Sequence, residues 1–285
     1  MLINKLRDMA QSNLGDEVRS AVLNVPIFCD EYERGALLEA ASLAGLDNVE
    51  LVNETTAGIY LLPVLFPTLS LIVCIAYAFN TTDSHHEMSS ENIVAFVLMG
   101  YRSTQVCVCA FRQGRITIMA TSYNRNLGGR NFDYLIFEYL KKKFDEQYRT
   151  VKDDWSTLSK YRLLSECRNL KERMSVNSDP LPIHIDYLVE NYNLDETMGR
   201  REFEDLSADL LKQFRTVLED CLERANVRRI DSVEMVGGGM RIPALKAVVK
   251  DVFKRECRIS LRPENPVVRG CTLKHAMSKA CYTIK

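Results

Sequence analysis

The sequence has almost no net charge and no cysteine pattern of a metal site. Its 37 Lys and Arg oppose 38 Asp and Glu, which leaves a formal charge of −1 at pH 7. Without a positive excess there is no electrostatic case for binding nucleic acid or an anionic membrane. None of the nine cysteines forms a C-x-x-C pair. Cys107 and Cys109, two residues apart, are expected to pack on one face of a strand rather than bind metal.

The first residues lack the pattern of a secretory signal. Met1–Met9 starts an amphipathic helix and has neither an apolar core nor a small-residue cleavage site. Together with the unpaired cysteine pattern, this indicates a reducing compartment. We therefore expect a cytoplasmic protein, with the nucleus as an alternative location. A hydrophobic content of 46% and a charged content of 26% are ordinary for a chain that buries a core.

Glycine is scarce, with 13 residues in the chain, yet three glycines are consecutive. Val233–Val236 is typical of a short buried strand, Gly237–Gly239 follows it, and Ile242–Phe253 has the apolar period of a helix. Glycines between a strand and a helix start suit a phosphate, because the backbone can come close and the helix end offers free N–H groups. A turn that binds no ligand is the alternative.

A strand–helix–strand pattern lies nearer the N-terminus. Ala21–Val25 predicts a strand, Asp30–Leu43 predicts a helix with Asp30 as its N-cap, and Val49–Val52 predicts a second strand. The polar turn Asn53–Ala57 follows. This order is the βαβ signature of an α/β protein, in which ligands gather at the carboxyl ends of the strands.

The later part of the chain alternates helices and strands. Trp155–Met174 and Arg201–Ala225 are typical of long amphipathic helices. Between them, Leu181–Leu188 has the alternation of a strand, which places His184 on the polar side without a partner that would make it a ligand.

Four motifs follow one another along the chain: N-V-P-I-F from Asn24, N-E-T-T-A from Asn53, L-G-G-R-N-F-D from Leu127 and V-G-G-G-M-R-I-P from Val236. In this order they resemble the ATPase domain of the 70-kDa heat-shock protein superfamily. The N-E-T-T-A turn and the strand Gln105–Phe111 are similar to the 110-kDa, nucleotide-exchange branch of that superfamily.

The resemblance implies an α/β fold, namely a partial actin-like ATPase fold. Residues 1–122 would form the later half of lobe I, with a hydrophobic insertion at 59–74. Residues 123–285 would form a complete lobe II. A first phosphate hairpin and a lysine that acts in hydrolysis would both precede the residue that aligns with Met1.

The same resemblance implies an altered second phosphate hairpin. Leu98 stands where the family has an Asp that organises Mg²⁺, and only Gly100 remains of the glycines. Glu54 still matches a carboxylate near the metal. We therefore expect neither an intact set of catalytic residues nor a metal site in the chain. If Mg²⁺ accompanies a bound nucleotide, Glu54 is the only residue that supports it.

The residues expected to contact the adenosine part of the nucleotide resemble the family more closely. Lys171 and Ser175, four apart on one helical face, match positions that contact the base and ribose, whereas Arg168 and Glu172 do not match the usual types. The other matching positions are Gly100, Gly128, Gly129, Gly237, Gly238, Arg241, Ile242 and Glu264. A solvated helix face for Lys171 and a plain tight turn for Gly128–Gly129 are the structural alternatives.

The implied function is that of a nucleotide-binding-domain fragment of a 110-kDa-type heat-shock chaperone. It would bind ATP or ADP, contact a 70-kDa chaperone and assist nucleotide exchange, with neither nucleic acid nor membrane as a partner. Two alternatives stay open. One is an ATP-hydrolysing 70-kDa-type chaperone, and the other is a non-functional product of an incomplete gene model.

An apolar segment, Ile59–Cys74, interrupts the resemblance. With Ile75–Phe79 it makes about 21 nearly uncharged residues, long enough to span a membrane. Pro63 and Pro67 argue against a regular helix. Its removal joins Asn53–Gly58 to the following residues much as in the family, so we interpret it as an insertion from a retained intron or gene-model error. A tolerated natural insertion and a membrane helix are the alternatives.

Deleting Ile59–Cys74 should raise the soluble fraction and the melting temperature of the chain. The segment has β-prone residues and no charge, which favours aggregation when it is exposed to water. Both forms can be expressed in parallel and melted. Equal solubility and an equal melting temperature would mean that the segment is an integral part of the fold.

Overall fold

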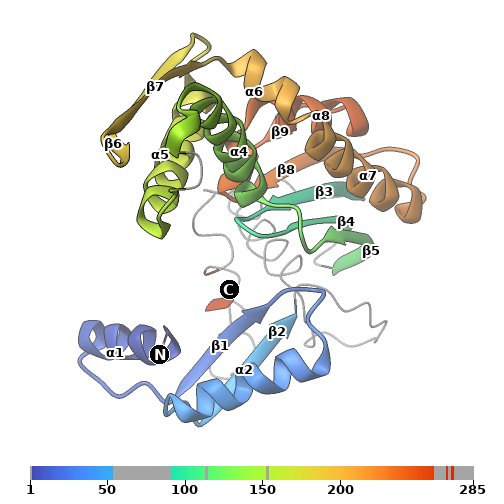
Figure 1. Ribbon diagram of the computed structural model, residues 1–285. Helices are drawn as coiled ribbons and strands as arrows, with labels where there is room; N and C mark the ends of the chain where they lie inside the picture. The colour runs from blue at the N-terminus through green and yellow to red at the C-terminus, as the bar shows by residue number, and fades with distance from the viewer. Residues whose placement is uncertain are drawn as a thin grey trace.

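The computed structural model describes residues 2–53, 91–112, 115–151, 154–259, 268 and 271–272. Within them the chain forms two α/β units, the first at the bottom of Figure 1 and the second above it. The insertion at 59–74 and two expected site residues, Glu54 and Glu264, lie outside the described residues.

The first unit is a βαβ motif preceded by a helix. Its elements are α1 (Leu2–Leu14), β1 (Ser20–Val25), α2 (Glu31–Leu43) and β2 (Asn48–Asn53). β1 and β2 pair in parallel. The Asp30 side chain accepts from Glu33 N at 2.8 Å, while Glu33 accepts from Asp30 N at 3.1 Å, and together these bonds form a capping box. The predicted strands, helix and N-cap are confirmed.

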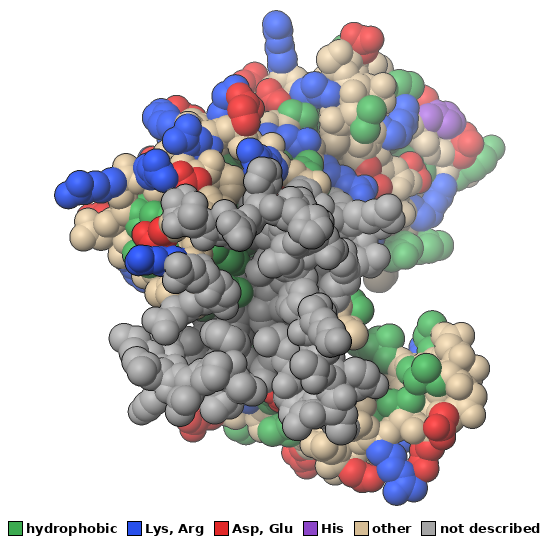
Figure 2. Space-filling model, turned by 180° about the vertical axis from the view of Figure 1, so that it is seen from behind, with side chains coloured by type: hydrophobic (Ala, Val, Ile, Leu, Met, Phe, Trp, Pro, Cys, Tyr) green, Lys and Arg blue, Asp and Glu red, His purple; other side chains and the backbone are tan. Residues whose placement is uncertain are grey.

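Helix α1 is amphipathic, as expected, but it buries none of its residues. Leu2, Leu6 and Met9 are 71%, 56% and 53% exposed. Apolar side chains gather over this part of the first unit at the lower right of Figure 2. The helix therefore adds little to the core of the described chain.

The second unit is built on a five-stranded sheet. Its strands are β3 (Asn92–Met99), β4 (Thr104–Arg112), β5 (Arg115–Asn124), β8 (Ser232–Val236) and β9 (Cys257–Arg258), in the order β5-β4-β3-β8-β9. β3 runs antiparallel to β4 and parallel to β8. Most residues of β3 and β4 are buried on both faces.

The remaining elements lie above and beside this sheet in Figure 1. They are α4 (Gly129–Gln147), η1 (Arg149–Val151), α5 (Thr157–Val176), β6 (Leu181–Val189), β7 (Tyr192–Met198), α6 (Arg200–Leu206), α7 (Ala208–Ala225), η2 (Gly238–Arg241) and α8 (Pro243–Phe253). α7 packs on β4, β5 and α8, whereas α4 packs on α5, which in turn contacts β6. One continuous hydrophobic core joins these layers. The fold is α/β, consistent with a partial actin-like ATPase fold.

Two expectations about element boundaries are wrong. The strands before residue 122 belong to the sheet of the second unit, because β3 pairs with β8. Asp231 strengthens this pairing: its N–H donates to Ile93 O at 2.7 Å and its carboxylate accepts from Ile93 N at 2.8 Å. The division between the units therefore lies between β2 and β3. The single helix expected at Arg201–Ala225 is split into α6 and α7 at Ser207.

The cysteines of the core act as small apolar side chains. Cys107, Cys109, Cys167 and Cys221 are fully buried. Burial raises the pKa of Cys167 and of Cys221, which keeps both thiols neutral. The expected packing of Cys107 and Cys109 is confirmed, with their Sγ atoms 3.7 Å apart.

Neither a metal cluster nor a membrane helix is found in the part of the chain that the structure describes. No three His, Cys, Asp or Glu side chains there are grouped to hold an ion. No helix among the same residues combines the length and the apolar character that a membrane crossing needs.

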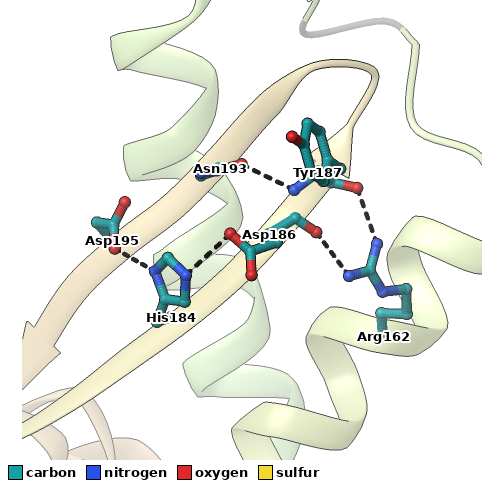
Figure 3. Close-up of polar contacts among 6 residues, drawn as sticks. All are labelled: Arg162, His184, Asp186, Tyr187, Asn193 and Asp195. Atoms are coloured by element: carbon teal, nitrogen blue, oxygen red, sulfur yellow. Dashed lines mark hydrogen bonds and ion pairs between the residues drawn. The ribbon is translucent and has the colours of Figure 1, made fainter.

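The β6–β7 hairpin carries a histidine between two carboxylates (Figure 3). The predicted alternation is confirmed, because Ile183 and Ile185 are buried while His184 is exposed. His184 Nδ1 bonds Asp195 across the hairpin, and its Nε2 lies 3.0 Å from Asp186 Oδ1. Hydrogen bonds to Asp195 and then to Asp186 raise the pKa of His184. These partners were missed by the sequence analysis.

The pKa of His184 should lie above its ordinary value of 6.5 and fall towards it in Asp195→Asn, because a neutral amide favours the imidazolium less. Since the folded pKa is raised, the stability that His184 contributes is complete below pH 6.5 and is lost as pH rises through the folded pKa. NMR titration measures this, with His184→Gln to assign the signal. An unchanged midpoint in Asp195→Asn would show that the contact does not form in solution.

Candidate functional site

Three turns meet at the carboxyl edge of β3 and β8. They are the β3–β4 turn, the start of α4 and the glycine run after β8. Because β3 and β8 are parallel neighbours, their carboxyl ends lie on the same edge of the sheet. Gly129 N donates to Gly100 O at 2.9 Å, which joins the first two turns. The glycine run packs against Met99 at the end of β3.

Packing accounts for two of the three consecutive glycines. Gly237 has a φ of +94°, and a Cβ there would lie 2.3 Å from Met99 O. A Cβ on Gly239 would lie 2.7 Å from the Met99 side chain. A Cβ on Gly238 would meet nothing within 4 Å. Gly238 is thus the glycine of this run that faces open space, where a ligand can approach the backbone.

The start of α4 already has hydrogen-bond partners. The N–H groups of Gly129 and Arg130 donate to the carbonyls of Gly100 and Tyr101, both at 2.9 Å. A Cβ on Gly128 would lie 2.5 Å from the backbone of Arg102, so the tight-turn interpretation holds there. A phosphate would have to displace the β3–β4 turn to use these N–H groups.

Lys171 is part of a buried ion pair rather than a solvated helix face. It is 9% exposed, and its Nζ lies 2.5 Å from Asp133 Oδ1 and 3.2 Å from Gly129 O. Ser175 Oγ donates to Lys171 O at 3.0 Å. The pair ties α5 to the start of α4, and breaking it would leave an uncompensated buried charge.

The β3–β4 turn carries an aromatic side chain that the motif analysis overlooked. Tyr101 is 52% exposed, and its ring centroid lies 5.0 Å from Cζ of Arg168 on α5. This cation–π contact gives Arg168 a structural partner. The signal in the sequence was an aromatic residue directly after Gly100, in a turn where the resemblance implies glycine.

The residues present fit a nucleotide in part and Mg²⁺ poorly. Gly238 leaves backbone accessible at the start of η2, and Arg241 is the last residue of the same short helix. Ile242 is 2% exposed and packs in the core. Leu98 is 7% exposed in β3 and has no oxygen to coordinate a cation.

An α/β sheet with glycine turns gathered at one carboxyl edge is typical of nucleotide-binding domains. The family profile described as "Hsp70 protein" matches residues 1–283. The chain therefore belongs to the Hsp70 family, and the resemblance stated above is confirmed.

Similar proteins come from the same family. The chain is 33% identical to "Heat shock 70 kDa protein 4L" of Homo sapiens over 288 residues, covering 100% of this chain and 32% of that protein. It is 34% identical to "Heat shock 70 kDa protein 4" of Canis lupus familiaris, covering 100% and 32%. It is 32% identical to "Heat shock protein 110" of Caenorhabditis elegans, covering 100% and 35%. The chain thus spans about a third of the length of these relatives.

Gly237→Ala should destabilise the chain by about 2–3 kcal/mol, because it combines a left-handed backbone with a clash against Met99. Gly238→Ala is the matched control and should change stability by less than about 0.5 kcal/mol, since its Cβ enters open space. Urea unfolding measures both free energies. Equal losses at the two positions would contradict the packing described here.

Proposed function

We propose that the chain is the nucleotide-binding-domain fragment of a 110-kDa-type heat-shock chaperone. It binds ADP or ATP weakly, does not hydrolyse ATP, and assists nucleotide exchange on a 70-kDa chaperone in the cytoplasm. The observation that carries the proposal is the meeting of three glycine turns at one sheet edge, in a member of the Hsp70 family. "Heat shock protein 110" among its relatives supports the branch.

The second unit supplies the described ligand-binding residues in this proposal. Gly238 and Arg241 form the open side of the site, and Lys171 and Ser175 flank it from α5. The remaining positions shape the turns around it: Gly100, Gly128, Gly129, Gly237 and Ile242. Glu54 and Glu264 belong to the proposed site by motif alone.

Weak binding follows from hydrogen bonds that are already made. The first N–H groups of α4 donate to the β3–β4 turn, and the Lys171 ammonium is paired with Asp133. A nucleotide gains free energy only from the donors that remain or that it releases from these contacts.

The lack of hydrolysis follows from position 98. Phosphoryl transfer depends on positioning and on electrostatic stabilisation of the phosphate and its metal. A buried leucine provides neither, so the ATP-hydrolysing alternative is disfavoured. Phosphate release from ATP should therefore stay at the background rate.

ADP should raise the melting temperature of the chain only at high concentration, because a ligand that binds the folded state stabilises it by mass action, by about 2.7 kcal/mol at 100 times Kd. Arg241→Ala should weaken this shift at least several-fold. Arg215→Ala, on the exposed face of α7, is the control and should leave the shift unchanged. A submicromolar Kd by calorimetry that Arg241→Ala does not alter would refute the proposed site.

A further inference from the structure

A cluster of four side chains joins the two units across 92 positions of sequence. Arg125 Nη2 donates to both carboxylate oxygens of Glu33, each at 2.9 Å. The Arg125 guanidinium also lies 4.7 Å from the ring centroid of Phe28. The Phe28 ring in turn lies 5.6 Å from the ring of Tyr123. These four residues are the inter-unit cluster.

Both sides of the inter-unit cluster are held by local structure. In the first unit, Glu33 belongs to the capping box of α2, where Asp30 N donates to it, and Phe28 lies in the connection from β1 to α2. In the second unit, Arg125 lies between β5 and α4, in a turn where Asn126 N donates to Asn124 Oδ1 at 2.9 Å. Little conformational entropy is then left to lose when the contact forms.

The chemistry of the contact exceeds that of a lone surface ion pair. An exposed pair contributes little to stability. Here one guanidinium engages a carboxylate and covers an aromatic ring, which the planar guanidinium can do and a lysine ammonium does less well. The Arg125 and Glu33 side chains remain 45% and 42% exposed, so the ionic part stays sensitive to salt.

We propose that Arg125 is a latch that holds the first unit against the connection from β5 to α4. Arg125 is exposed and lies outside the continuous core of the second unit, so its release leaves that core intact. Gly128 follows three residues later, at the start of α4. Opening of the latch thus removes this contact between the units and frees the connection that enters the glycine turn.

Two variants weaken the latch in different ways. Arg125→Ala removes both the ion pair and the ring contact. Glu33→Gln removes the charge but keeps an amide oxygen for the capping box, so α2 should stay capped. Arg215→Ala is the matched control, because the ion pair of Arg215 with Asp251, at 2.6 Å, joins α7 to α8 inside the second unit.

Energy transfer reports the distance between the units. The chain has a single tryptophan, Trp155 of the second unit. Its fluorescence can transfer excitation energy to a fluorophore on the N-terminal amine beside α1. Arg125→Ala and Glu33→Gln should each lower the transfer efficiency, and amide exchange of the segment 27–34 should become several-fold faster. Because both act through one contact, the double variant should resemble Arg125→Ala. High salt should likewise lower the transfer efficiency and speed this amide exchange in the unaltered chain.

Hydrogen exchange in α4 and α5 shows whether the second unit stays folded in each variant. Transfer and exchange that do not change in Arg125→Ala, or that change equally in Arg215→Ala, would overturn the latch. The measurement uses no nucleotide, so its outcome is independent of the proposed function.

Discussion

The parallel pairing of β3 with β8 is the constraint on which the second unit depends. It brings together two stretches of chain about 140 residues apart and places their carboxyl ends at one edge. Gly237 can follow β8 only because it has no side chain to meet the Met99 carbonyl. The β3–β4 turn is then held against the start of α4, so the position of each glycine turn follows from the pairing of two strands.

At this edge, the first backbone N–H groups of α4 already donate hydrogen bonds to the backbone of the β3–β4 turn. The carbonyls of Gly100 and Tyr101 accept hydrogen bonds from the N–H groups that a phosphate would use. The Tyr101 ring also stacks on Arg168, where a glycine would leave space. These contacts favour the hydrogen-bonded turn over the binding of a ligand to the same N–H groups. Affinity for an anion is therefore set by the free energy needed to move the turn, as well as by contacts with the anion.

Local patterns in the sequence predicted local structure well. Alternation predicted β6, and a capping residue with helical period predicted α2, because both depend on residues within a few positions of each other. The boundary near residue 122 was wrong because pairing of β3 with β8 leaves no local pattern. Contacts between charged residues, such as Lys171 with Asp133, were missed for the same reason. The motifs predict a site at these turns, and only the structure shows that the first N–H groups of α4 are already hydrogen-bonded.

The buried ion pair of Lys171 with Asp133 also limits which substitutions the chain can accept at these two positions. Losing either partner alone strands a charge in the core, so the two positions must change together or stay as they are. Selection for folding is then enough to keep the lysine, even in a lineage that no longer needs a nucleotide. The lysine that matches the family motif at this position is accounted for by its ion pair, so its presence is not by itself evidence that a nucleotide binds.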